Sequence, residues 1–514
     1  MYMEGSSILS HLEANMSTSQ LLAERPAMAA PRVAERKAHP NISLAVILTV
    51  QLMLVLDVTV VNIALPEMQE VLHFSQSNLS WVLNAYLLTF GGLLLLGGRM
   101  GDLFGRKRLF IGGVTLFILA SFAGGLAMSA GWLVAARAVQ GIGAALAAPS
   151  ALALLMVSFP EGPARNRALS YFTAVSSAGG SIGLILGGML TSWVSWRWVL
   201  FINVPIGIAV VVLASRFIAG TARQRGRVDL LGALTATLGM GSLVYAFIRA
   251  GSNGWNDAGT VWAFVLAAGL LGAFVVIEMR HEQPIMPLHL LANRNRVSAF
   301  FSVLCTVVAM YGSFFYLTQF LQRVMEYSPI VTGIAFLPMT VSIFAISRIV
   351  PRLIPRLGPQ RILIAGTSLI VLATLWFTQI SVTSPYAPGI VIPMILLGVG
   401  VGSSFLPLSI IVLSGVPGRE AGAASGMLQT MQQVGGALGL SILVTVFATA
   451  TRAAPARLLV GASPALRPEI IFTHGLTSVF VLAAVFALLS LANGLLMMRA
   501  PSRPDPAIPV ALTE

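Results

Sequence analysis

Residues Leu56 to Pro66 read LDVTVVNIALP, and they place a carboxylate, Asp57, deep inside a long apolar segment. On an α-helix, with about 100° between successive residues, the face of Asp57 carries apolar neighbours, namely Met53, Val60, Val61 and Ala64. A carboxylate at the centre of a membrane helix costs roughly 2.5 to 3.5 kcal/mol, so a chain that keeps one there usually uses it. We therefore predict that Asp57 binds and releases a proton. The alternative is a buried Asp that only holds two helices together.

The composition excludes a soluble protein. Of the 514 residues, 56% are hydrophobic and 10% are charged, whereas soluble globular domains carry about 25% charged residues. We therefore predict an all-α, polytopic membrane protein. The single cysteine, Cys305, cannot form an intramolecular disulfide, and the six His residues show no metal-ligand spacing with Cys. Without a Walker motif the chain does not use ATP itself, so we expect no metal and no cofactor, and a proton gradient as the energy source.

Apolar segments long enough to cross a membrane recur along the chain after a polar N-terminal stretch. Residues 1–42 lack the apolar core of a signal peptide and are predicted to form a disordered tail. The sequence predicts fourteen transmembrane helices, at 43–65, 81–98, 109–128, 132–155, 169–192, 198–216, 229–249, 259–278, 297–320, 330–349, 361–380, 388–414, 421–448 and 473–498.

The distribution of Lys and Arg predicts the orientation. With the N-terminus in the cytoplasm, 18 basic residues fall in cytoplasmic loops and 6 in the opposite loops. This is a strong positive-inside signal, and it explains the basic pI without nucleic acid. We therefore predict a multi-pass protein of a bacterial plasma membrane, with both termini cytoplasmic and membrane lipid as its surroundings.

Two similar basic connectors suggest an internal repeat. The loop after the second helix reads GGRMGDLFGRKR and the one after the tenth reads SRIVPRLIPRLGPQR. We predict two six-helix bundles, at 43–216 and 297–498, joined by a linker at 217–296 that carries two extra helices and followed by a cytoplasmic tail at 499–514. Basic inner loops occur in any polytopic protein, so the repeat alone is moderate support.

The first of these connectors resembles the signature loop of the major facilitator superfamily. The matching residues are Gly101, Asp102, Gly105, Arg106, Lys107 and Arg108, whereas Leu103 stands where the family usually has Arg. The resemblance implies a gating role at the inner ends of the two bundles. Physically, glycines permit a tight turn, and the acidic and basic side chains can pair near helix ends. The alternative is a solvated basic loop.

Further stretches resemble the fourteen-helix drug:proton antiporters of that superfamily. They are LDVTVVNIALP, LVAARAVQGIGAALAAPS (Leu133 to Ser150), WRWVLFINVPIG (Trp196 to Gly207) and GREAGAASGMLQTMQQVGGALG (Gly418 to Gly439). One departure is Leu184, which follows Gly183 where the antiporter signature of the fifth helix has Pro. Gly179, Gly183 and Gly187 still repeat every four residues, so we predict a close helix contact without a proline kink.

Arg137, in the fourth helix, is the second costly residue. The resemblance implies a role in proton coupling for this Arg. From physics, a buried Arg needs an anion or carbonyl groups nearby, and Asp57 is the deep carboxylate on offer. The alternative is that Arg137 lies near the outer end of its helix and reaches water, because only five residues separate it from Trp132.

Amide and aromatic side chains in the predicted helices are candidates for a substrate cavity. We select Asn62, Asn84, Tyr86, Gln140, Tyr311, Gln319, Gln429 and Gln433. Such a surface suits bulky lipophilic or cationic compounds better than sugars. For any single one of these residues, a hydrogen bond that only joins two helices is the simpler interpretation.

These patterns predict a monomeric transporter that exports hydrophobic or cationic small molecules, including antibiotics, in exchange for protons. The alternatives are a transporter of one metabolite, in either direction, and a membrane-embedded enzyme. An enzyme would need a pair of acid and base groups near one interface, and only His281 beside Glu282 resembles one.

Overall fold

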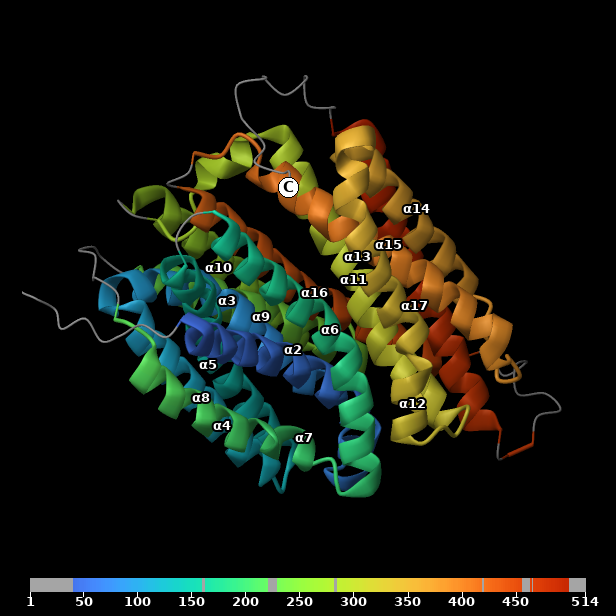
Figure 1. The fold of residues 1–514 in the computed structure, drawn as a ribbon. Coiled ribbons are helices and arrows are strands. Elements are labelled where there is room, and N and C mark those ends of the chain that lie inside the picture. Colours follow the sequence, from blue (N-terminus) through green and yellow to red (C-terminus); the bar gives the residue numbers. More distant parts are fainter. Residues whose placement is uncertain are drawn as a thin grey trace, which may run out of the picture. The chain divides into compact units, whose positions relative to one another are not determined.

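We analysed a computed structural model of the chain, which describes residues 40–159, 162–220, 229–281, 284–417, 420–454, 463–464 and 466–498. Every regular element in these ranges is a helix (Figure 1). Fourteen helices in the described part are long and apolar enough to cross a membrane, as the sequence predicted. The predicted tails fall outside the described residues, except that the first helix already begins at Pro40 rather than at residue 43.

The first six spans are formed by seven helices. Their bounds are α2 (Pro40–Val71), α3 (Trp81–Phe104) with the preceding turn η1 (Asn78–Ser80), α4 (Arg106–Gly125), α5 (Ala130–Ser158), α6 (Pro163–Trp193), α7 (Trp198–Phe201) and α8 (Asn203–Phe217). The sixth span consists of α7 and α8, which meet at Ile202, where the backbone dihedral angles remain helical. We call α2 to α8 the N-terminal helices.

The extra pair of spans is formed by α9 (Leu230–Asn253) and α10 (Ala258–Arg280). The last six spans are formed by η2 (Leu288–Ala292), which leads into α11 (Arg294–Arg323), and by α12 (Pro329–Ala335), α13 (Leu337–Leu357), α14 (Pro359–Phe377), η3 (Tyr386–Ile390) with α15 (Val391–Leu413), α16 (Ala421–Arg452) and α17 (Arg467–Leu496). The tenth span consists of α12 and α13, which meet at Phe336. We call α11 to α17 the C-terminal helices.

Local sequence explains where several helices begin and end. Gly105 has φ of 97°, a conformation that favours glycine, and it separates α3 from α4. The hydroxyl of Ser129 accepts a hydrogen bond from the backbone N–H of Trp132 and so caps α5, and Asn293 caps α11 in the same way through Arg296. The chain therefore turns sharply where the predicted gating loop lies.

The packing of helices repeats in the two groups. Among the N-terminal helices the most extensive contacts join α4 with α5, α3 with α5, and α2 with α6. Among the C-terminal helices the contacts of α14 with α15, α13 with α15, and α11 with α16 join the spans of the same rank. This repetition supports the division into two six-helix bundles. The extra helices α9 and α10 pack on each other, and α9 also contacts α3 and α16 (Figure 1).

The glycines of the fifth span lie against the first span. A Cβ atom at Gly183 would collide with Thr59, and one at Gly187 would lie 2.9 Å from the Cα of Val60. The backbones of α6 and α2 therefore approach closely along this seam.

Because the spans alternate in direction, their connections fall on two faces. We call the face with Gly105, Gly358 and the end of α17 the basic face, and the face with residues 72–77, 254–257 and 324–328 the far face. These names refer only to the loops on each face.

Candidate functional site

Asp57 on α2 and Arg137 on α5 form an ion pair in the interior of the N-terminal helices. The Arg137 Nη1 atom lies 2.5 Å from the Asp57 Oδ2 atom, and each residue is 1% exposed. Arg137 also donates from Nε to the backbone carbonyl of Val82 on α3, at 3.0 Å. The alternative that Arg137 extends to water near the end of its helix is therefore wrong, because its guanidinium is buried and paired.

Three further side chains complete a polar cage around Asp57. Gln140, on α5, donates from Nε2 to Asp57 Oδ1 at 2.6 Å, and Asn203, at the start of α8, donates from Nδ2 to the same oxygen at 3.2 Å. Both amides also donate to the hydroxyl oxygen of Ser121 on α4, at 2.6 Å and 3.3 Å. Four helices thus meet at one carboxylate.

The cage surrounds the carboxylate with hydrogen-bond donors and one positive charge. Its two oxygens accept hydrogen bonds from Gln140, Asn203 and Arg137, and the guanidinium supplies an opposite charge. Burial opposes this, because a buried charge loses its hydration. A change that separates Arg137 from Asp57 would remove the main support of the charge, so the arrangement can alternate between a paired, ionised carboxylate and an unpaired, protonated one.

Gln140 was predicted to line a substrate cavity, but the structure places it in this cage, where Arg137 Nη1 also donates to its Oε1 at 2.7 Å. Sequence reasoning missed Ser121 and Asn203. Asn203 lies in the stretch Trp196 to Gly207, which was noticed for its family resemblance, whereas no sequence signal marks Ser121.

Tyr86, on α3, packs against the ion pair. The Arg137 Cζ atom is 4.5 Å from the centre of the Tyr86 ring. Tyr311, on α11, donates to the Oε1 atom of Gln433 on α16, at 3.4 Å. The Tyr86 hydroxyl is buried without a hydrogen-bond partner, as are both polar atoms of Asn84 on the same helix. Of the predicted cavity residues, Tyr86 therefore contacts the ion pair, whereas Tyr311 and Gln433 join α11 to α16.

Asn62 and Gln319, also predicted to line the cavity, belong instead to a network that joins α2 to α11 toward the far face. Asn62 donates to Thr318 Oγ1 at 2.7 Å, and Gln76 donates to Gln319 Oε1 at 2.5 Å. The other members are Gln322, which donates to the carbonyl of Ile63, and Arg323, which donates to Gln69 and Gln76. We call Asn62, Gln69, Gln76, Gln319, Gln322 and Arg323 the far-face network. It holds the two helix groups together on that face.

The predicted gating loop lies on the basic face. Asp102 Oδ1 accepts hydrogen bonds from Arg106 Nε at 3.0 Å and Nη2 at 2.8 Å, across the turn at Gly105. Lys107 donates to the backbone carbonyl of Ser215 at the end of α8, at 2.9 Å. Arg108 lies in the first turn of α4, and Gly101 lies beside Ser150 of α5. The loop therefore ties together the N-terminal helices.

A cavity of about 560 Å³ opens beside this loop, between α3 and α5 on one side and α16 on the other. Its walls include Asp102, Arg106, Ser150 and Gly426, together with Gln429, another of the predicted substrate residues. The two helix groups are thus separated by a cavity near the basic face, whereas the far-face network joins them on the opposite face. Beside this network lies the far-face cavity, of about 930 Å³, whose lining includes Glu67, His73, Arg323 and Tyr327.

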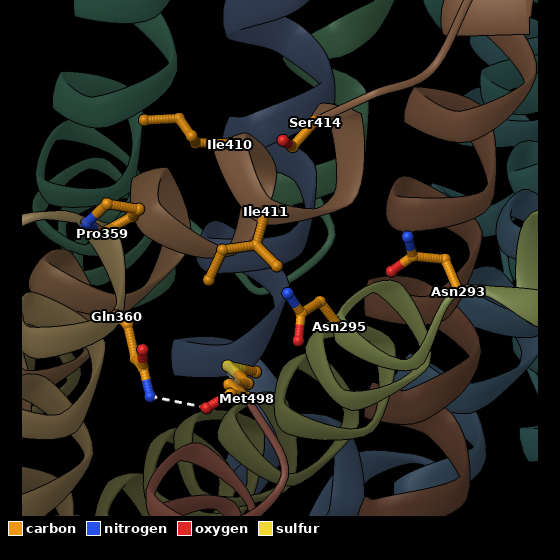
Figure 2. Close-up of a pocket in the computed structure, with 8 residues that line it drawn as sticks. All are labelled: Asn293, Asn295, Pro359, Gln360, Ile410, Ile411, Ser414 and Met498. Carbon is orange, nitrogen blue, oxygen red and sulfur yellow. Dashed lines mark hydrogen bonds between the residues drawn. The ribbon is translucent and has the colours of Figure 1, made fainter. Parts of the chain in front are cut away.

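Two other hollows lie away from the ion pair. A groove of about 820 Å³ runs between α3, α5, α9 and α10, and near its far-face end Arg249 Nε lies 2.6 Å from Asp257 Oδ2. This guanidinium lowers the pKa of Asp257, so the carboxylate stays ionised at neutral pH. A smaller hollow of about 100 Å³ on the basic face is lined by Gln360, which donates to the carbonyl of Met498 at 2.8 Å (Figure 2). Its size suits ordered water rather than a drug-sized molecule.

A bundle of fourteen membrane-length helices, with a buried ion pair and a network that closes one face, defines a membrane transporter. The model of the Major Facilitator Superfamily matches residues 47–440, and the chain belongs to this family. It is 40% identical over 415 residues to the puromycin resistance protein pur8 of Streptomyces alboniger, covering 80% of this chain and 82% of that one. It is also 40% identical over 417 residues to the cephamycin export protein CmcT of Amycolatopsis lactamdurans, covering 80% and 85%.

Solved structures agree on the fold. The chain superposes on a POT family transporter in complex with a thioalcohol-conjugated peptide with a TM-score of 0.63, over 89% of this chain and 96% of that chain, at 12% sequence identity. At this identity the likeness concerns the fold alone. The protein is therefore a multi-pass membrane protein with a major facilitator fold and is not an enzyme.

Proposed function

We propose that this protein exports hydrophobic or cationic small molecules, antibiotics among them, from the cytoplasm in exchange for protons that enter through Asp57. The observation that carries the proposal is the Asp57–Arg137 ion pair, buried among four helices of the N-terminal group. Relatives that are named for puromycin resistance and cephamycin export support antibiotics as the substrate class.

The proposed direction rests on the orientation of the chain. We place the basic face in the cytoplasm, with both termini there, because 18 loop Lys and Arg residues fall on that side and 6 on the other. The far-face network then closes the outer side, and the cavity beside Asp102 opens inward. The conformation described here is thus the one that loads substrate from the cytoplasm.

Proton exchange supplies enough energy for export. Each proton that enters returns about 2.3 kcal/mol per 100 mV of membrane potential, and about 1.4 kcal/mol per pH unit. A tenfold substrate gradient costs about 1.4 kcal/mol, so one proton per cycle is sufficient. Protonation of Asp57 would weaken its attraction to Arg137 and thereby change the relative stability of the two access states.

Coupling between the substrate and the proton site would pass through Tyr86. Its ring contacts Arg137, and its hydroxyl is buried without a hydrogen-bond partner, which a substrate could supply. A bound substrate that reaches Tyr86 would therefore disturb the cation that stabilises the Asp57 carboxylate. We propose Asn84, Gln429 and Gln433 as substrate contacts. We also propose that the bundles 43–216 and 297–498 are the two bodies that move relative to each other about the site.

The test is flux into inside-out membrane vesicles. Ethidium, a fluorescent lipophilic cation, and puromycin would be offered with and without an inward-acid pH gradient, to the native protein and to Asp57→Asn. We expect accumulation that depends on the gradient for at least one compound and its loss in the variant. Accumulation that ignores the gradient, or movement out of the vesicles, would contradict proton-driven export.

A further inference from the structure

Asn203 and Ser121 contact the proton site from helices that carry neither member of the ion pair. Both side chains are buried, at 2% and 0% exposure. Asn203 reaches both Asp57 Oδ1 and the Ser121 hydroxyl oxygen, and Gln140 reaches the same two atoms from α5. Asp57 is therefore held on one side by the cation and on the other by a group of neutral side chains.

Asn203 reaches Ser121 because α8 packs closely on α4. Gly207, one turn after Asn203, lies against Ile118, one turn before Ser121, and a Cβ atom at Gly207 would collide with that side chain. Asn203 follows Ile202, whose backbone is helical, and its amide reaches Ser121 on α4. The close contact at Gly207 therefore lets the Asn203 amide reach the carboxylate of Asp57.

The chemistry of these neutral groups differs from that of Arg137. A guanidinium only donates hydrogen bonds, so it stabilises the carboxylate and cannot accept from a carboxylic acid. An amide and a hydroxyl can do either, because the amide can turn over and the hydroxyl can rotate. Asn203 can thus stay bonded to Asp57 in both of its protonation states, with Ser121 holding the amides of Asn203 and Gln140 in place, whereas Arg137 can bond only to the ionised form.

The helices around Asp57 contribute both charged and neutral side chains to its surroundings. Within the described residues, Arg137 from α5 is the charged partner of the carboxylate, and Tyr86 from α3 lies on the other side of that guanidinium. From α4 and α8 the contacts to the cage come from Ser121 and Asn203.

We infer that Asn203 and Ser121 are positioning residues that hold Asp57 in place through both halves of the proton cycle and set the pH range in which it exchanges its proton. The inference rests on the proposed proton-coupled function. Without Asn203 both forms of Asp57 lose a hydrogen-bond partner, but the bond to the ionised carboxylate is the stronger one, so the protonated form gains relative to it and exchange moves to higher pH.

The experiment measures gradient-driven ethidium uptake into inside-out vesicles as a function of pH, with purified protein checked for unchanged thermal stability. Asn203→Leu removes the amide at similar volume, Ser121→Ala removes the hydroxyl, and Asn203→Thr restores one polar group. We expect the pH of half-maximal uptake to rise by about one pH unit in Asn203→Leu, the effect of one lost hydrogen bond to a charged group. The shift should be smaller in Ser121→Ala and partly reversed in Asn203→Thr.

Asn493 offers a matched control, because its amide donates to the carbonyl of Ser298 and to Ser302 Oγ at 2.7 and 2.8 Å within the C-terminal helices. Asn493→Leu should leave the pH profile unchanged. A native profile in a stable Asn203→Leu protein, or an equal shift in Asn493→Leu, would overturn the positioning role. If Asp57→Asn also keeps gradient-driven uptake, the proposed function itself fails, so the two failures can be told apart.

Discussion

The guanidinium of Arg137 lies 2.5 Å from the carboxylate of Asp57, and neither side chain reaches solvent. The two residues are 80 positions apart in sequence and come from different helices. Breaking such a pair by removing one partner typically costs about 3 to 5 kcal/mol, because a charge is left buried and alone. If Arg137 is removed, this cost is smaller, because the carboxyl group of Asp57 can take up a proton and become neutral.

Arg137→Ala should therefore change the proton affinity of Asp57 without unfolding the protein. Without the cation, we expect Asp57 to be protonated over a wider pH range, so that substrate-induced proton release occurs only at higher pH. The protein should fold, because the protonated carboxyl can still bond to Gln140 and Asn203. Proton release would be recorded with a pH indicator in weakly buffered detergent solution. Release at the native pH in this variant would show that the ion pair does not control the proton.

Orientation is testable with cysteine labelling in a Cys305→Ser background. The structure places Asn253 and Ala453 on the far face and exposes Ala219 and Ser414 on the basic face. An impermeant maleimide added to whole cells should label cysteines at Asn253 and Ala453 and spare those at Ala219 and Ser414. In inside-out vesicles the pattern should reverse. The opposite pattern would place the basic face outside and reverse the proposed direction of loading.

The far-face network should determine how often the outer side opens. Arg323→Ala removes the donor shared by Gln69 and Gln76, and a lost hydrogen bond from a charged group is worth about 1.5 to 3 kcal/mol. We expect a roughly tenfold or larger shift toward the outward-open state. Spin labels at His73 and Tyr327, which line the far-face cavity, would report it as a longer distance by pulsed electron resonance.

Arg452→Ala is the control for this measurement, because Arg452 donates to the carbonyl of Ser252 and lies outside the network. An unchanged distance distribution in Arg323→Ala would mean that other contacts, such as those between α6 and α12, close the far face.

Asp102→Asn tests the basic loop. Asp102 pairs with Arg106 at a half-exposed position, where an ion pair is worth about 0 to 1 kcal/mol, so stability should change little. If the residue governs the exchange of access states, transport should slow severalfold while the equilibrium affinity for ethidium stays near native. An equal loss of affinity and flux would show that Asp102 supports the folded structure instead.

The helices and the ion pair could be predicted from the sequence because both follow from local rules. Long apolar segments identify spans, and Asp57 and Arg137 stand out as charges that a membrane helix keeps only for a reason. The position of Gln140 was also within reach, since it lies three residues after Arg137 and so shares its helix face. Choosing it for a substrate cavity missed that geometry.

Ser121 and Asn203 could not be predicted, because their contact depends on how α4 packs on α8, where Gly207 lies against Ile118. The bonds of Asn62 and Gln319 were also beyond a sequence argument. Both are amides in apolar helices, as a substrate contact would be, and only the approach of α2 to α11 in this conformation reveals their partners.

The central claim is that Asp57 carries the exchanged proton, and Asp57→Asn tests it most directly because it imitates the neutral form at nearly constant volume. The measurement is proton release when ethidium or puromycin is added to purified protein in weakly buffered detergent solution, with binding followed in parallel by calorimetry. The native protein should release protons as a compound binds. The variant should bind the same compound and release none, whereas release at the native level in Asp57→Asn would contradict the account and leave the carboxylate as a structural contact.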